Sequence, residues 1–101
     1  GQAALCWVTA AGGVFYGSNT GSATVSAFEV GPSGVPVLSG VAAHGEGGTT
    51  DAAATPNGRF LYVSNGGAGT VDEFHVDADG TLFEIGIAGG LPTPFEGIVA
   101  T

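Results

Sequence analysis

Residues 60–76 read FLYVSNGGAGTVDEFHV, and residues 14–30 read VFYGSNTGSATVSAFEV. The two stretches align without a gap at a spacing of 46 residues, which places Tyr16 opposite Tyr62. Repetition at this length is typical of proteins in which one supersecondary unit is copied along the chain. The same spacing continues through three further pairs, which are Gly34 and Gly80, Gly40 and Gly86, and Ala42 and Ala88.

Each repeat predicts four short antiparallel β-strands, because apolar and aromatic runs alternate with turn sequences rich in Gly, Asn, Asp and Pro. Val25 is out of phase with Phe28 and Val30, which predicts a bulge or a two-sided environment near it. No segment has a capped apolar period of 3.6 residues, so the fold class is all-β. The expected strands are Leu5–Thr9 and Ala52–Thr55 (inner), Val14–Asn19 and Phe60–Asn65 (second), Thr24–Val30 and Thr70–Val76 (third), and Val35–Val41 and Thr81–Ile87 (outer).

The inner strands are small or apolar throughout, so we expect burial on both of their faces. A similar segment, Ile98–Thr101, predicts one extra inner strand after the two four-stranded units. The gap-free spacing makes Thr9, Thr55 and Thr101 equivalent points. The chain then divides into an inner strand over 1–9, the rest of a first unit over 10–46, a second unit over 47–92 and a closing strand over 93–101.

Composition excludes several classes of partner. The chain of 101 residues has a formal net charge of −8, and its single Lys or Arg residue is Arg59. This charge argues against nucleic acids and anionic membrane surfaces as partners, since cationic groups are needed to neutralise phosphates. No stretch approaches the roughly 20 apolar residues of a membrane-spanning helix. One cysteine, Cys6, permits no intrachain disulfide. High Gly and Thr content, acidity and the absence of lysine are compatible with an extracytoplasmic location.

Four-stranded antiparallel units of this length, with small residues in the first strand, describe the blades of a β-propeller. Residues 60–65 (FLYVSN), 70–74 (TVDEF) and 79–82 (DGTL) resemble the blade repeat of lactonase-type seven-bladed propellers, a family that includes 6-phosphogluconolactonases and a carboxymuconate-lactonizing enzyme and overlaps with the Tyr-Val-Thr-Asn repeat proteins. Residues 95–100 (FEGIVA) resemble the closing segment of that family. The resemblance implies the C-terminal two blades and closing strand of such a propeller.

Two blades cannot close a ring, and a repeat unit cannot bury its apolar faces alone. The missing blades come either from the rest of a longer propeller or from identical chains. With identical chains, the closing strand of one would compete with the first strand of the next. In a longer propeller every strand has a place, which favours that account.

Five polar residues are candidates for catalysis. His44, Glu46, Asp51 and Glu96 lie nearest the starts of the inner strands, where propellers often bind ligands at the mouth of the central channel. A His–carboxylate pair there would act as general base on a water that attacks a lactone carbonyl, and Arg59 would stabilise an oxyanion or hold an acidic group. The alternative is that these residues are solvated loop residues, a turn cap and a surface ion pair. One cation cannot complete a site for phosphorylated sugar lactones.

Other residues favour structural roles. Asp77–Gly80 begins like a calcium loop but lacks its later ligands, which indicates a hairpin turn. His75 is expected in solvent, Cys6 as a buried inert thiol, and Trp7 in the wedge between the units. We expect no cofactor and no metal. Three functions remain open: lactone hydrolysis by the completed ring, a non-enzymatic scaffold that binds protein or glycan, and a self-assembling unit that builds a ring or filament.

Overall fold

The computed structural model describes residues 5–30, 32–44, 48–93, 97, 98 and 100, and these contain eight β-strands and no helix. None of the described segments is therefore a helix that could span a membrane. The strands are β1 (Leu5–Ala11), β2 (Val14–Asn19), β3 (Thr24–Val30), β4 (Pro36–His44), β5 (Thr49–Ala54), β6 (Phe60–Asn65), β7 (Thr70–Val76) and β8 (Leu82–Ala88).

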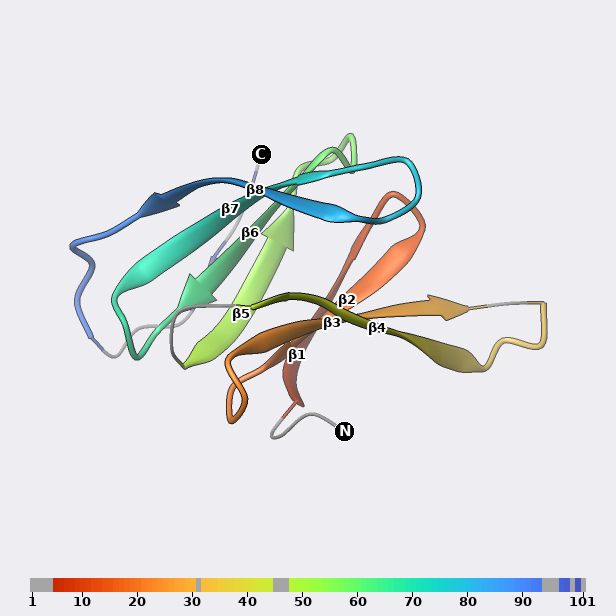
Figure 1. The fold of residues 1–101 in the computed structure, drawn as a ribbon, viewed down its shortest axis with the longest axis horizontal. Helices are drawn as coiled ribbons and strands as arrows, with labels where there is room; N and C mark the ends of the chain where they lie inside the picture. The colour runs from red at the N-terminus through yellow and green to blue at the C-terminus, as the bar shows by residue number, and fades with distance from the viewer. Residues whose placement is uncertain (1–4, 31, 45–47, 94–96, 99, 101) are drawn as a thin grey trace.

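The strands form two antiparallel sheets, with orders β1-β2-β3-β4 and β5-β6-β7-β8 (Figure 1). We call these the first and the second sheet. Within each sheet, sequential strands are neighbours, because short turns join them. The sheets pack face to face, with β5 against β1 and β2. The all-β prediction and the two four-stranded units are thus confirmed.

The core lies between the two sheets. Strand residues alternate between faces, so Val14 and Tyr16 of β2 point to the second sheet while Phe15 points away. Tyr16 and Leu61 are both fully buried in this core. The other buried members of the cluster are Ala11, Val25, Ala52, Val63, Phe74, Val76 and Leu82.

The inner strands depart from the gap-free spacing. Tyr16 pairs with Thr9 and Tyr62 pairs with Ala53, so the inner strands match at 44 residues rather than 46. Thr9 and Thr55 are therefore not equivalent. The two-residue turn Gly12-Gly13, with both φ angles positive, closes the first hairpin. The second hairpin has a longer turn, which a Thr55 N–H to Phe60 carbonyl bond of 3.0 Å closes, and this turn accounts for the difference.

Register shifts occur in both sheets, and some of them are at matching places. The register between β3 and β4 shifts between Val25 and Ser26, as the phase of Val25 predicts. On the inner strands, the pairing shifts between Leu5 and Trp7 in β1 and between Thr49 and Asp51 in β5. A bulge bends the strand and changes the direction of nearby side chains, so both inner strands begin with the same irregularity.

Two expectations about the inner strands need correction. Ala52 and Ala53 of β5 are buried, but Trp7 and Val8 of β1 are each 51% exposed. Trp7 therefore does not fill a wedge between the sheets. The first sheet packs on β5, whereas no described part of the chain covers the outward face of the first sheet, to which Val8 points.

The closing strand over 93–101 is not among the eight strands. Thr93, Gly97, Ile98 and Ala100 lie outside regular secondary structure, and 94–96, 99 and 101 lie outside the described residues. A strand needs a hydrogen-bonded neighbour, and the expected neighbour of this segment belongs to a further blade.

Candidate functional site

Polar side chains are buried at one end of the packed sheets. This end contains the last residues of β2 and β6 and the first residues of β3, β5 and β7, whereas the apolar core fills the other end. We call it the polar end. Its buried polar residues are Ser18, Asn19, Thr24, Ser26, Thr49, Asp51, Ser64, Asn65 and Asp72. In the propeller resemblance, it is the end at which the chain enters each inner strand.

Asn65 organises the polar end of the second sheet. Its amide oxygen accepts a 3.1 Å hydrogen bond from the Thr49 hydroxyl, and its amide nitrogen donates a 3.2 Å bond to the Thr70 hydroxyl. Asn65 thereby ties β5, β6 and β7 together where the β6–β7 turn begins. Because all three groups are polar and two are fully buried, each bond offsets a desolvation cost.

Asn19 has the equivalent place in the first sheet. Its amide nitrogen donates to the hydroxyls of Thr24 at 3.2 Å and Ser26 at 2.8 Å. The two sheets are joined at this end by the Thr20 hydroxyl, which donates a 2.6 Å hydrogen bond to the Thr49 carbonyl. The start of β5 is therefore fixed from both sides.

Asp51 is the acidic residue of the inner strand at this end. It follows the bulge at Thr50 and is 7% exposed. Its Oδ1 accepts a 2.7 Å hydrogen bond from the Ala52 N–H, and its strand partner is Ser64, whose buried hydroxyl has no hydrogen-bond partner among the described residues. The Thr50 hydroxyl is buried in the same way. A carboxylate is one of the groups that serve as general base in catalysis, and buried hydroxyls without a partner are uncommon in folded proteins.

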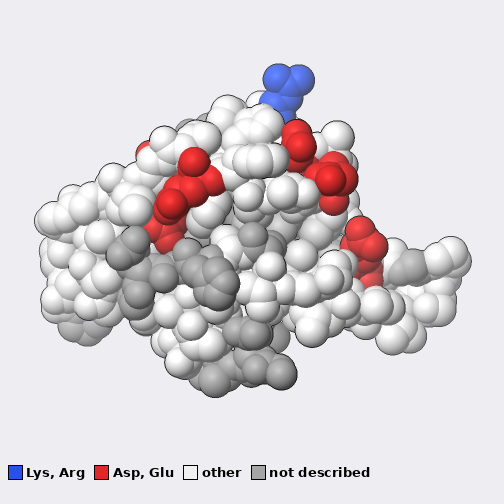
Figure 2. Space-filling view, in the orientation of Figure 1, with Lys and Arg blue, Asp and Glu red and all other residues white. Residues whose placement is uncertain are grey.

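The structure describes the positions of three of the five predicted catalytic residues, His44, Asp51 and Arg59. His44 is the last residue of β4, paired with Thr24 on the outer edge of the first sheet, whereas Asp51 is in the first strand of the second sheet. Arg59 lies in the β5–β6 turn, at the opposite end of β5 from Asp51. Figure 2 shows its basic group projecting from the surface. Glu46 and Glu96 lie outside the described residues, as does the side chain of His44.

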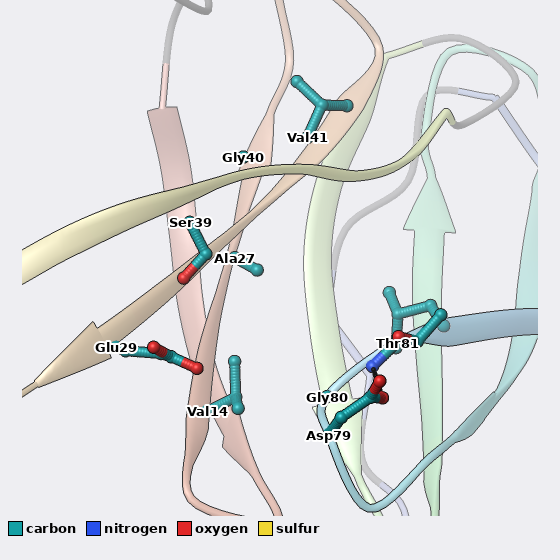
Figure 3. A pocket seen from close by; sticks show the side chains of 10 residues that line it. Val14, Ala27, Glu29, Ser39, Gly40, Val41, Asp79, Gly80 and Thr81 are labelled. Carbon is teal, nitrogen blue, oxygen red and sulfur yellow. Dashed lines mark hydrogen bonds between the residues drawn. The ribbon is translucent and has the colours of Figure 1, made fainter.

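A cavity of about 250 Å³ opens at the apolar end, between the outer part of the first sheet and the β7–β8 turn (Figure 3). Two carboxylates, Glu29 and Asp79, line it from opposite sides. The Tyr16 hydroxyl donates a 2.5 Å hydrogen bond to the Gly80 carbonyl beside it. Burial raises the pKa of Tyr16 above its ordinary 10.0, and the Asp79 charge adds to this rise.

The β7–β8 turn is the hairpin that the sequence predicts for Asp77–Gly80. Asp77 and Thr81 pair through an N–H to carbonyl bond of 2.9 Å, and the Thr81 N–H donates to Asp79 Oδ1 at 3.0 Å. Thr81, through its N–H and then its hydroxyl, lowers the pKa of Asp79. No group of three His, Cys, Asp or Glu residues in the described ranges has a metal-binding arrangement.

The structure also locates the remaining sequence candidates. His75 is partly buried rather than solvated, because its ring packs edge-on against Phe60 with centroids 5.6 Å apart. Cys6 is the unpaired residue of the β1 bulge, and its side chain lies outside the described set.

Sequence reasoning placed Asp51 at this end but missed the buried Ser, Thr and Asn side chains around it. The pairs Ser18-Asn19 and Ser64-Asn65 are visible in the repeat but indicate only turn chemistry there. Burial shows that these residues do more than form a turn. In a solvated turn, water would satisfy the Asn65 amide, whereas here the amide is hydrogen-bonded to residues of two other strands. Recurrence of a Ser-Asn pair followed by Thr at the start of the next strand was the available signal.

Comparison with known proteins supports the fold. No family model matches the sequence, and no curated protein matches it. Among solved structures, a candidate 6-phosphogluconolactonase from Bacteroides uniformis superposes with a TM-score of 0.73 at 22% identity, over 84% of this chain and 26% of that one. A protein of unknown function from Desulfotomaculum acetoxidans superposes with a TM-score of 0.75 at 18% identity, over 89% of this chain and 29% of that one.

These likenesses show the fold, a β-rich chain of two blade-like four-stranded antiparallel sheets. The chain spans little more than a quarter of the length of the two structures that it matches. Identities of 22% and 18% concern the fold, and the chemistry has to be argued from the site.

Proposed function

We propose that the chain supplies two adjacent blades of a lactonase-like β-propeller that hydrolyses a sugar or organic-acid lactone at the polar end. The observation that carries the proposal is Asp51, a buried carboxylate placed by a bulge at the start of an inner strand. The fold of the Bacteroides protein agrees with it. An extracytoplasmic location is part of the same proposal.

Asp51 is the general base in this scheme. It removes a proton from a water molecule, whose oxygen attacks the lactone carbonyl carbon. The ring C–O bond then breaks, and the ring oxygen takes the proton back from Asp51 to give an open hydroxy acid. Hydroxyls such as those of Thr50 and Ser64 would hold the substrate, and His44, Glu46 and Glu96 would extend the site from the neighbouring connections.

The position of Arg59 bears on the substrate. Arg59 is the only Lys or Arg of the chain, and it lies at the far end of β5 from Asp51. These two blades therefore bring no cation to the polar end, where a phosphorylated substrate would require one. We propose an unphosphorylated lactone for this reason.

The test measures whether the completed propeller hydrolyses a panel of unphosphorylated sugar and organic-acid lactones. Hydrolysis is monitored by pH-stat titration of the acid released. Asp51→Asn should lower kcat by about 10²-fold or more, the usual contribution of general base catalysis. Asp79→Asn is the matched control, because it makes the same change in an exposed carboxylate at the other end of the sheets. Full activity in Asp51→Asn, or no turnover of any panel member, would refute the proposed chemistry.

A non-enzymatic scaffold that binds a protein or glycan is the second candidate. The observation that favours it is the number of buried Ser, Thr and Asn side chains at the polar end, which suits hydrogen bonding to hydroxylated ligands. Binding to a glycan array by a chain that turns over no lactone would select this alternative.

A further inference from the structure

The outward face of the first sheet has an uncovered apolar hollow of about 360 Å³. Val8, Phe15 and Val30 are 51%, 38% and 44% exposed there, and Phe28 and Pro36 complete the lining. All five residues are apolar. We call this surface the receiving face.

Each residue of the receiving face has a counterpart in the core. Phe15 and Phe28 correspond through the 46-residue repeat to Leu61 and Phe74, which are 0% and 3% exposed because the first sheet covers them. The further counterparts are Val76 for Val30, Leu82 for Pro36 and, at the 44-residue spacing of the inner strands, Ala52 for Val8. The receiving face is therefore equivalent to the core-facing surface of the second sheet, and the structure shows how the first sheet packs on that surface.

The second sheet has the complementary surface. Tyr16, Val14 and Val25 of the first sheet contact the core, and their counterparts Tyr62, Phe60 and Val71 lie on the face of the second sheet that points away from it. We call this the docking face. Through the 46-residue repeat, the docking face is equivalent to the face of the first sheet that covers Leu61 and Phe74.

The turn glycines supply a specific polar contact. Gly80 accepts the hydrogen bond of Tyr16, and a Cβ at Gly80 would lie 2.8 Å from Val14 Cγ2. Its counterpart Gly34 has a similar positive φ, 76° against 87°, but an added Cβ there would meet nothing within 4 Å. The Gly34 carbonyl is thus equivalent to the Gly80 carbonyl, and there is space beside Gly34 for a tyrosine side chain.

We propose that two copies of this chain associate head to tail, with the docking face of one on the receiving face of the next. The Tyr62 hydroxyl of one copy donates to the Gly34 carbonyl of its neighbour, as Tyr16 does to Gly80 within the chain. The interface is heterologous, so it extends to a ring or a filament rather than stopping at a symmetric dimer. The proposal is independent of whether the assembly hydrolyses a lactone.

Two features of the chain affect the strength of this association. A net charge of −8 on each copy opposes it, so added salt should strengthen it by screening that repulsion. The incoming β1 also takes the place expected for a closing strand over 93–101, and only one of the two can occupy it. Removal of the residues after Thr93 should therefore tighten the association.

The first test measures mass by analytical ultracentrifugation over a concentration series. The full chain should form multiples of 9.7 kDa. Phe15→Lys should weaken association by at least about tenfold, because burying a Phe side chain is worth more than the corresponding 1.4 kcal/mol. This change reduces the negative charge, so it cannot act by added repulsion.

Phe83→Lys is the matched control. Phe83 is 53% exposed. Its counterpart in the first sheet, Val37, stays 62% exposed although the two sheets pack together, so this position should also lie outside the contact between copies. Its association should equal that of the unmodified chain. Equal loss in both variants would overturn the assignment of the receiving face, and a full chain that remains a folded 9.7 kDa monomer at every concentration would overturn self-association itself.

A mixing experiment tests the head-to-tail geometry. Phe15→Lys weakens the receiving face and Tyr62→Lys weakens the docking face, so each variant alone should be monomeric at a concentration where the full chain associates. Their mixture should give a 1:1 heterodimer and nothing larger, because one intact face of each kind remains. If either variant alone still forms dimers, the contact is not heterologous and the proposal fails.

Folding of the Tyr62→Lys chain is checked by circular dichroism, and Tyr62→Phe provides a milder alternative. Loss of one hydrogen bond should raise the dissociation constant about fivefold, the equivalent of about 1 kcal/mol. An unchanged dissociation constant in Tyr62→Phe would remove the Tyr62–Gly34 contact from the proposal.

Discussion

Replacement of Gly80 by alanine tests the packing of the two sheets more directly than any other single change. Gly80 has a φ of 87°, and a Cβ placed on it would lie 2.8 Å from Val14 Cγ2 and 3.3 Å from the Tyr16 hydroxyl. Gly34 is the same residue in the same hairpin of the first sheet, with a φ of 76° and no atom within 4 Å of the added Cβ. Comparison of Gly80→Ala with Gly34→Ala therefore separates contact between the sheets from backbone strain.

The expected magnitudes follow from this geometry. Both variants pay about 1 kcal/mol for an L side chain at positive φ. Gly80→Ala should lose about 1 to 3 kcal/mol more of unfolding free energy by overpacking against Val14, and about 1 kcal/mol by weakening the hydrogen bond from Tyr16. We expect a loss of unfolding free energy of about 3 to 5 kcal/mol at Gly80 and about 1 kcal/mol at Gly34. A domain of this size has about 5 to 15 kcal/mol in total, so the first loss is severe.

Urea denaturation followed by tryptophan fluorescence measures the difference, at a protein concentration where the chain is monomeric. Trp7 is the only tryptophan and lies in β1, so its signal reports on the first sheet. The midpoint should fall far more in Gly80→Ala than in Gly34→Ala. Equal losses in the two variants would show that the β7–β8 turn does not pack against the first sheet, and the reasoning would fail.

Four further outcomes follow from the hydrogen bonds and the pKa shifts. Tyr16→Phe should lower the unfolding free energy by about 1 kcal/mol, whereas Tyr62→Phe leaves the monomer unchanged. Because the folded-state pKa of Tyr16 is raised above 10.0, stability should fall as the pH rises past 10.0, and a pH series of melts on Tyr16→Phe should lose that part of the fall. Asn65→Ala leaves the buried Thr49 hydroxyl without its acceptor and should cost about 2 to 4 kcal/mol by urea titration. The lowered pKa of Asp79 contributes stability above the ordinary value of 3.8 that is lost as the pH falls, and acid titration of Asp79→Asn should lack this contribution.

The sequence alone determined the strands and their order. Alternation, turn glycines and the 46-residue repeat are local signals, and short hairpins leave an antiparallel chain few ways to pair. The bulge near Val25 and the hairpin at Asp77–Gly80 were predictable for the same reason. The two-residue difference in length between the β1–β2 and β5–β6 turns could not be predicted. Small residues such as those at 52–54 carry almost no information about strand register.

Tertiary structure alone decided which faces and which polar groups are buried. Val8 and Ala52 are equivalent residues of the two inner strands, yet Val8 is half exposed and Ala52 is covered. The first sheet packs on the face of the second sheet that carries Ala52, whereas no described part of the chain covers the face of the first sheet that carries Val8. The role of Asn65 likewise depends on Thr49 and Thr70 arriving from two other strands. Burial is a property of what packs on a residue, and in this repeat the same residue pattern is core on one sheet and surface on the other.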